Sequence, residues 1–172
     1  SDGDGTPVPW VGTGAGVLNF GGRQRNSAYA LNVGVGLDVH LAAIEATMAA
    51  MQERAAEADQ FATAPISLRW TGASKAYMAP QYGRATCMIE PPALHPTIGG
   101  MELLYQLQNL LYRYNGRPHW GLEFNLSGTD DLPRRLWPKY PTFVEQVRRF
   151  NARGTFDSVF TDRLGLSRIP VG

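Results

Sequence analysis

An imidazole and an indole stand next to each other at His119 and Trp120, bracketed by Pro118 and Gly121. Catalytic groups are often carried on loops that a rigid scaffold holds in place. His119 is therefore a candidate acid–base group that points into a cleft. The alternative is a structural turn with Trp120 in the core. The residues of this segment leave both interpretations open.

Other chemistry-bearing residue types favour structural roles. The run Gly12-Thr13-Gly14-Ala15-Gly16 resembles half of a dinucleotide-binding fingerprint, but prolines precede it and a strand-like VLNF follows it. Without a strand before it and a helix after it, a flexible loop is expected. His40, His95 and His119 lack the spacing of a metal site, so no metal is expected. Cys87 is expected to be a small buried apolar residue.

The composition is that of a folded domain with many loops. The 172 residues are 44% hydrophobic and 18% charged, with 19 glycines, 12 prolines and a net charge of +1. A nearly neutral chain is not expected to bind nucleic acid through a bulk positive field. No apolar run is long enough to span a membrane. A single cysteine forms no internal disulfide, so secreted, periplasmic and cytoplasmic locations all fit.

Alternating strand and helix patterns predict an α+β fold, with an antiparallel sheet and helices packed on one of its faces. Apolar alternation predicts strands over residues 14–20, 29–37, 66–71 and 84–90, and a short strand towards residue 125. Apolar residues at helical spacing predict helices over residues 39–58, 103–114, 131–137 and 142–151. The stretch after residue 154 is expected to be irregular.

Two helix ends carry specific signals. Asp38 is expected to cap the first helix through its carboxylate. Gly116 is expected to be the left-handed residue that ends the second helix. The buried face of the first helix is expected to carry Leu41, Ile44, Met48 and Met51.

The order and spacing of several motifs resemble the C-terminal part of a flavoprotein family, the aldonolactone oxidoreductases and alditol oxidases of the vanillyl-alcohol-oxidase type. The motifs are PISLRW, the strand ending in YGRATCMIE, a leucine-rich helix, GRPHWG and LWPKYPTFVEQVRRFNARGTF. They extend over roughly residues 32–166. The resemblance implies the cap-like α+β domain that, in this family, covers the FAD isoalloxazine and forms the substrate pocket.

The resemblance also implies a division of labour between two chains. Residues 1–28 are expected to be the N-terminal loop and first strand of a cut or processed chain, and residues 29–172 the substrate domain with its tail. The glycine and histidine motifs of the family's FAD-binding domain are absent from this sequence. A partner chain, either a cleavage product or a separate subunit, is therefore expected to bind most of the FAD. Covalent attachment of the FAD is left open.

The matching positions imply roles for individual residues. Arg69 is expected to orient the substrate oxygen or to stabilise developing negative charge, and Glu90 or His119 to take the hydroxyl proton. The structural alternatives are an ion pair at Arg69 and a strand-end salt bridge between Glu90 and a neighbour such as Arg84. His119 and Trp120 are expected beside the flavin. The expected substrate-binding positions are Ser67, Leu122 and Asn125.

Two positions depart from the family pattern. Ser67 replaces the glutamate of a Glu-x-Arg pair, and Leu122 replaces a substrate-binding lysine. A pocket without these groups suits a less polar substrate. The expected reaction is oxidation of a CH–OH group, in a sugar lactone, an alditol or a less polar alcohol such as a sterol, by hydride transfer to FAD. The same losses fit an alternative, a non-catalytic binding module that keeps the cap fold.

Overall fold

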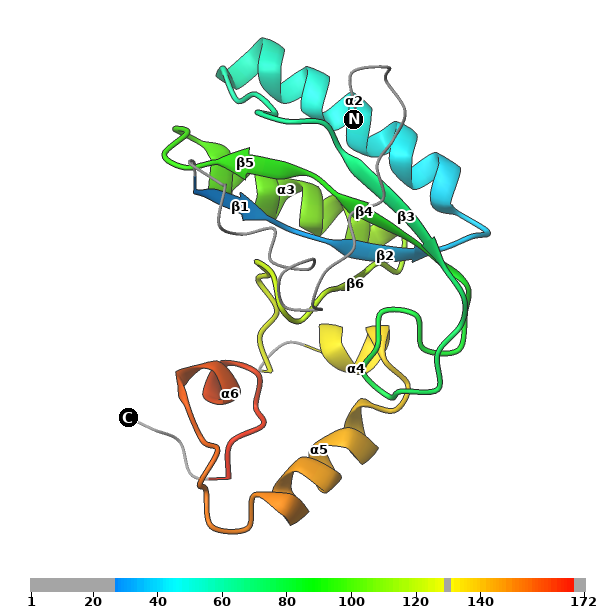
Figure 1. The fold of residues 1–172 in the computed structure, drawn as a ribbon, viewed down its shortest axis with the longest axis vertical. Helices are drawn as coiled ribbons and strands as arrows, with labels where there is room; N and C mark the ends of the chain where they lie inside the picture. Colours follow the sequence, from blue (N-terminus) through cyan, green and yellow to red (C-terminus); the bar gives the residue numbers. More distant parts are fainter. Residues whose placement is uncertain (1–26, 129–130, 169–172) are drawn as a thin grey trace, which may run out of the picture.

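The computed structural model describes residues 27–128 and 131–168 (Figure 1). The loop expected over residues 1–13 and the strand expected over 14–20 lie outside this part of the chain. The described strands are β1 (Ala28–Ala30), β2 (Val33–Gly36), β3 (Ser67–Thr71), β4 (Thr86–Glu90), β5 (Pro92–Leu94) and β6 (Arg117–Pro118). The described helices are α2 (His40–Ala58), α3 (Gly100–Arg113), α4 (Leu132–Leu136), α5 (Tyr140–Phe150) and α6 (Val159–Arg163).

Four of these strands form an antiparallel sheet in the order β3-β4-β2-β6, and β1 pairs with β5 in a second antiparallel sheet. The two sheets share two chain segments, 28–36 and 86–94, because Ala30 pairs with Pro92 and Val33 pairs with Ile89 in the same register. The strand predicted over residues 29–37 is therefore broken between β1 and β2. The break faces Pro91, which has no N–H to donate to a ladder. The strand predicted over residues 84–90 ends at Glu90, and pairing resumes after Pro91 in β5.

Helices α2 and α3 pack on one face of the four-stranded sheet, as the α+β prediction requires (Figure 1). The strand register places Val33, Leu68 and Ile89 on this face. Leucines from α3 meet them in a common core, in which Leu103, Leu104, Leu107 and Leu111 are all at most 2% exposed. Cys87 is also fully buried here, as predicted.

Helix α2 buries only part of the face that its apolar spacing predicts, because Ile44 and Met51 pack against the core and Leu41 and Met48 do not. Leu41 and Met48 are 65% and 52% exposed, whereas Ala43 and Thr47 are fully buried. Small side chains let a helix backbone lie close to a sheet, and the larger residues then fall on its flank. The prediction of Asp38 as the N-cap is also wrong, since Val39 occupies that position with no side-chain hydrogen bond.

The end of α3 has the capping bonds of a Schellman motif, shifted by one residue from the prediction. Asn115, with φ of 56°, is the left-handed residue instead of Gly116. Its N–H donates to Tyr112 O, and the N–H of Gly116 donates to Leu111 O at 3.0 Å. Gly116 is needed for another reason. A Cβ there would lie 2.6 Å from both Leu111 O and Val33 Cγ1.

Helices α4, α5 and α6 lie below the sheet in the view of Figure 1. Residues of this C-terminal third form a second core together with Met78 and Tyr112. Trp137, Leu136 and Leu126 are at most 1% exposed in it. Helices α4 and α5 confirm two predictions, whereas α6 lies in the stretch expected to be irregular. The strand expected towards residue 125 is shorter than predicted, because β6 ends at Pro118. Within the described residues, none of the helices is both long and apolar enough to cross a membrane.

Candidate functional site

The sheet face opposite α2 and α3 carries polar side chains at the end near Glu90. In the β3–β4 register, Ser67 lies opposite Glu90, and Arg69 lies opposite Met88. Side chains alternate between the two faces of a strand. Ser67, Arg69 and Glu90 therefore lie on the sheet face opposite the one that Leu68 and Ile89 occupy. The other end of this face is covered, because a Cβ at Gly34 would meet Pro80 and Met88.

Arg69 and Glu90 form the ion pair of this face. Arg69 Nη1 donates to Glu90 Oε2 at 2.7 Å, and the two side chains are 55% and 21% exposed. The hydrogen bond from Arg69 to Glu90 and the negative charge of Glu90 raise the pKa of Arg69 above its ordinary value. The alternative partner Arg84 does not contact Glu90; it donates to the carbonyls of Gly34 and Asn115.

Asn32 is a member of this cluster that the sequence reasoning missed. Its Nδ2 donates to the same Glu90 Oε2 at 2.6 Å, and the residue is only 4% exposed. The sequence does contain a pattern that could have identified Asn32. Asn32 is a polar residue between Leu31 and Val33, in a segment whose alternation otherwise assigns apolar side chains to the core.

His119 lies on the edge of the sheet that is furthest from Arg69. Its backbone N–H donates to Asn32 O at 2.7 Å, which ties it to the same cluster. Its ring accepts a hydrogen bond at Nδ1 from the N–H of Gly121 at 3.0 Å. A backbone N–H can only donate, so in the neutral ring the proton sits on Nε2. His119 is exposed and presents Nε2–H as a donor.

The arginine of the same motif is structural. Arg117 is 6% exposed and donates to Leu136 O at 2.6 Å and to Tyr82 O at 2.7 Å. Burial, with a smaller effect of nearby Arg84, lowers the pKa of Arg117 to about 10. Arg117 therefore ties the sheet to α4 and to the loop that follows β3.

The indole of Trp120 is turned into the second core. Its Nε1–H donates to Met78 O at 2.7 Å, and its ring packs at 5.0 Å from Trp137 and 5.3 Å from Phe124. With its N–H bonded and its ring packed, Trp120 has the contacts of a core residue. The role beside the flavin stays a prediction for Trp120.

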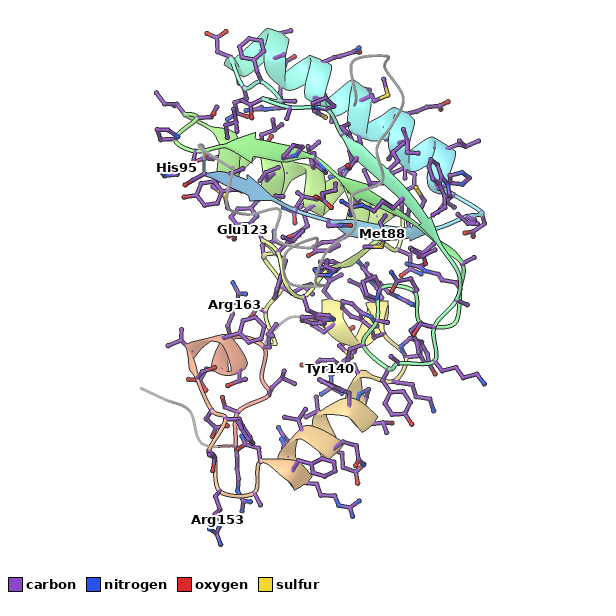
Figure 2. All side chains as sticks on the ribbon, in the orientation of Figure 1. Met88, His95, Glu123, Tyr140, Arg153 and Arg163 are labelled. Atoms are coloured by element: carbon purple, nitrogen blue, oxygen red, sulfur yellow. The ribbon has the colours of Figure 1, made fainter. Side chains whose placement is uncertain are left out.

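Leu122 lines a cavity of about 350 Å³, together with Trp120, Glu123, Phe124 and Arg163. Figure 2 shows Glu123 on the loop below β1 and Arg163 on α6 beneath it. Arg163 lies over the ring of Phe124 at 4.8 Å. The cavity therefore offers apolar and charged groups together, and Leu122 is 36% exposed in it.

Asn125 is held by α3 and makes no described contact with Arg69 or Glu90. Its backbone N–H donates to Gln108 Oε1 at 2.7 Å, and its Nδ2 donates to Asn109 Oδ1 at 3.0 Å. The structure thus joins Arg69, Glu90 and Ser67 on two strands and links His119 to them through Asn32. It places Leu122, Trp120 and Asn125 on the segment that leaves β6.

The family model for D-arabinono-1,4-lactone oxidase matches residues 23–164. The chain belongs to the D-arabinono-1,4-lactone oxidase family. This confirms the family expected from the motif order, and the family is one of oxidoreductases. A search among curated proteins finds no significant match.

The family assignment gives the polar face its context. The matched range holds every candidate site residue, from Ser67 and Arg69 to Asn125. Across residues 27–128 and 131–168, no three His, Cys, Asp or Glu side chains gather as a metal site would require. Among the candidate site residues of this member of the D-arabinono-1,4-lactone oxidase family, the ionisable side chains are the Glu90 carboxylate, the Arg69 guanidinium and the His119 imidazole.

Proposed function

We propose that this chain is the substrate-covering part of an FAD-dependent oxidoreductase that converts a CH–OH group into a carbonyl. The observation that carries the proposal is the Arg69–Glu90 pair, held at 2.7 Å on the partly exposed face of the sheet. The family match supports an oxidoreductase as the reaction class. When bound, FAD would supply the acceptor for the hydride that leaves the substrate carbon.

Glu90 is the proposed proton acceptor. Both hydrogen bonds that it receives from described side chains, from Asn32 and from Arg69, end on Oε2. No described residue donates to Oε1, so Oε1 is the atom available to accept the hydroxyl proton of a substrate. His119 is the poorer base, because its Nδ1 already accepts from Gly121 and its Nε2 carries the proton.

Arg69 is the proposed group that holds the substrate oxygen. Its side chain is 55% exposed. Among the described residues, the only hydrogen bond of this side chain is the one that Nη1 donates to Glu90. The remaining guanidinium N–H groups can donate to the oxygen as it loses its proton. A fixed positive charge next to that oxygen stabilises the negative charge that develops there.

The polar groups on this face fit the edge of a flavin ring. Arg69 and His119 offer N–H donors. A flavin edge presents carbonyl acceptors, which these donors would hold. Most of the FAD would be bound by a separate FAD-binding domain, and we propose that this domain pairs with the present chain.

Leu122 suggests the class of substrate. It stands in a cavity of about 350 Å³ next to Trp120 and Phe124, where the family resemblance implies a lysine. A leucine side chain cannot form a hydrogen bond with a substrate hydroxyl group. We therefore propose that the substrate is an alcohol less polar than a sugar lactone. Steady-state rates on lactones, alditols and apolar alcohols test this. A clear preference for the polyols contradicts it.

The whole proposal is tested on protein purified from its native source. Flavin absorption should follow this chain through purification, together with a polypeptide that binds FAD. In rapid mixing, Arg69→Ala and Glu90→Gln should each lower the limiting rate of flavin reduction by about 100-fold. Arg153→Ala, at the far end of the molecule in Figure 2, is the matched control. A colourless and stable single chain would instead support the non-catalytic binding module.

A further inference from the structure

Asn32 is a buried amide in an otherwise apolar segment. It is 4% exposed, and its neighbours Leu31 and Val33 are fully buried. Burying an amide is unfavourable unless hydrogen bonds replace those lost to water. Asn32 recovers only part of them, because its Oδ1 is buried with no described donor. An apolar residue would serve a purely structural position better.

The bonds that Asn32 does make link two parts of the proposed site. Its Nδ2 donates to Glu90 Oε2 at 2.6 Å, and its backbone oxygen accepts from the N–H of His119 at 2.7 Å. The orientation of the amide follows from the first bond. An ionised carboxylate can only accept, so Nδ2 faces Glu90 and Oδ1 points elsewhere.

Arg69 also donates to Glu90 Oε2, but it is a less rigid support. The Arg69 side chain is 55% exposed, whereas Asn32 is only 4% exposed. A long exposed side chain has many conformations, and in the proposed reaction Arg69 also engages the substrate oxygen. Asn32, a shorter and buried side chain, is therefore the more restricted of the two donors to Oε2.

We propose that Asn32 is the positioning residue of Glu90. It anchors Oε2 from the break between β1 and β2 and so directs Oε1 to the open side of the sheet, where a hydroxyl proton is to be taken. Asn32 acts through Glu90 and does not touch the substrate. The proposal rests on the function proposed above, in which Glu90 is the proton acceptor.

The test is a double-mutant cycle on the flavin-loaded protein with its FAD-binding partner. Asn32→Leu keeps the approximate volume and removes the donor. We expect it to lower the limiting rate of flavin reduction by about tenfold to 100-fold, because small displacements of a catalytic group have effects of that size. The apparent substrate affinity should change less than about threefold. In a Glu90→Gln background, Asn32→Leu should change the rate less than about twofold.

Thr47→Val is the matched control. Thr47 is fully buried, and its hydroxyl donates to Ala43 O within α2, on the opposite side of the sheet. It should leave the rate of flavin reduction unchanged. A second measurement does not depend on activity. In ¹H–¹⁵N spectra, the Asn32 side-chain amide should exchange slowly with solvent, and Glu90→Gln should shift its signals.

The outcomes separate the two proposals. Equal losses from Asn32→Leu in both backgrounds would overturn the positioning role, since the effect would not pass through Glu90. If Glu90→Gln slows the reaction and Asn32→Leu does not, the positioning role fails and the proposed function stands. If Glu90→Gln itself has no effect, the proposed function loses its proton acceptor, and the role of Asn32 falls with it.

Discussion

Ser67 of β3 and Glu90 of β4 are direct partners across the antiparallel ladder. The family resemblance implies a glutamate at position 67, on the same strand as Arg69. In this protein the carboxylate stands on the neighbouring strand and still lies 2.7 Å from Arg69. A guanidinium–carboxylate pair therefore forms here although position 67 carries no glutamate.

Moving the carboxylate back should restore the pair. Glu90→Ser should lower the limiting rate of flavin reduction by about 100-fold or more. Adding Ser67→Glu should recover at least about tenfold of that loss, because directly opposed side chains reach the same space. Ser67→Glu alone should be less stable than the wild type, since it opposes two carboxylates. No recovery in the double variant would show that the two positions are not equivalent.

Substrate polarity should depend on Leu122. Leu122→Lys introduces a cation into the cavity that Phe124 and Glu123 line. We expect kcat/KM for sugar lactones and alditols to rise about tenfold relative to apolar alcohols. Leu94→Lys is a matched control, because Leu94 is also 36% exposed but lies on β5 outside that cavity. An unchanged substrate ratio for Leu122→Lys would argue against a binding role for Leu122.

Two buried tyrosines should respond oppositely to loss of the hydroxyl. Tyr140 donates to Leu164 O at 2.6 Å, whereas the Tyr112 hydroxyl is buried with no described partner. Tyr140→Phe should lower the free energy of unfolding by about 1–2 kcal/mol. Tyr112→Phe should be neutral or stabilising by up to about 1 kcal/mol, because no bond to a described residue is lost. Urea unfolding at pH 7 measures both, and a large loss in Tyr112→Phe would contradict this.

Tyr112 should also make the fold sensitive to alkali. Burial raises the pKa of its hydroxyl above the ordinary value of about 10. Above pH 10 the unfolded chain releases this proton while the folded chain keeps it. The free energy of unfolding is therefore unaffected by Tyr112 ionisation below about pH 10, and it falls as the pH rises further. Stability should fall less steeply between pH 9.5 and 11 in Tyr112→Phe than in the wild type.

Gly116 should tolerate no side chain. Its Cβ would lie 2.6 Å from Leu111 O and from Val33 Cγ1, so Gly116→Ala should cost about 1–3 kcal/mol of unfolding free energy. Gly72→Ala is the matched control, with no atom within 4 Å of the added Cβ. It should be neutral or slightly stabilising. Equal thermal midpoints for the two variants would contradict the packing argument.

The sequence alone determined the family, the α+β class and most of the elements. Motif order, apolar periodicity and turn residues are local signals, and they located β3, β4, α3 and α5 to within a few residues. They also singled out Arg69, Glu90 and His119. The exposed flank of α2 was not predictable, because periodicity marks an apolar face without saying how closely the helix approaches the sheet.

Only the tertiary structure decided which residues meet. The partner of Glu90 is Arg69 rather than Arg84, and Asn32 joins them, because the strand order β3-β4-β2-β6 makes neighbours of segments far apart in the chain. The register of that pairing depends on long-range packing, which no single segment encodes. Long-range packing also decided the place of Trp120. Its indole lies in the second core, where it donates to Met78 O and packs against Trp137.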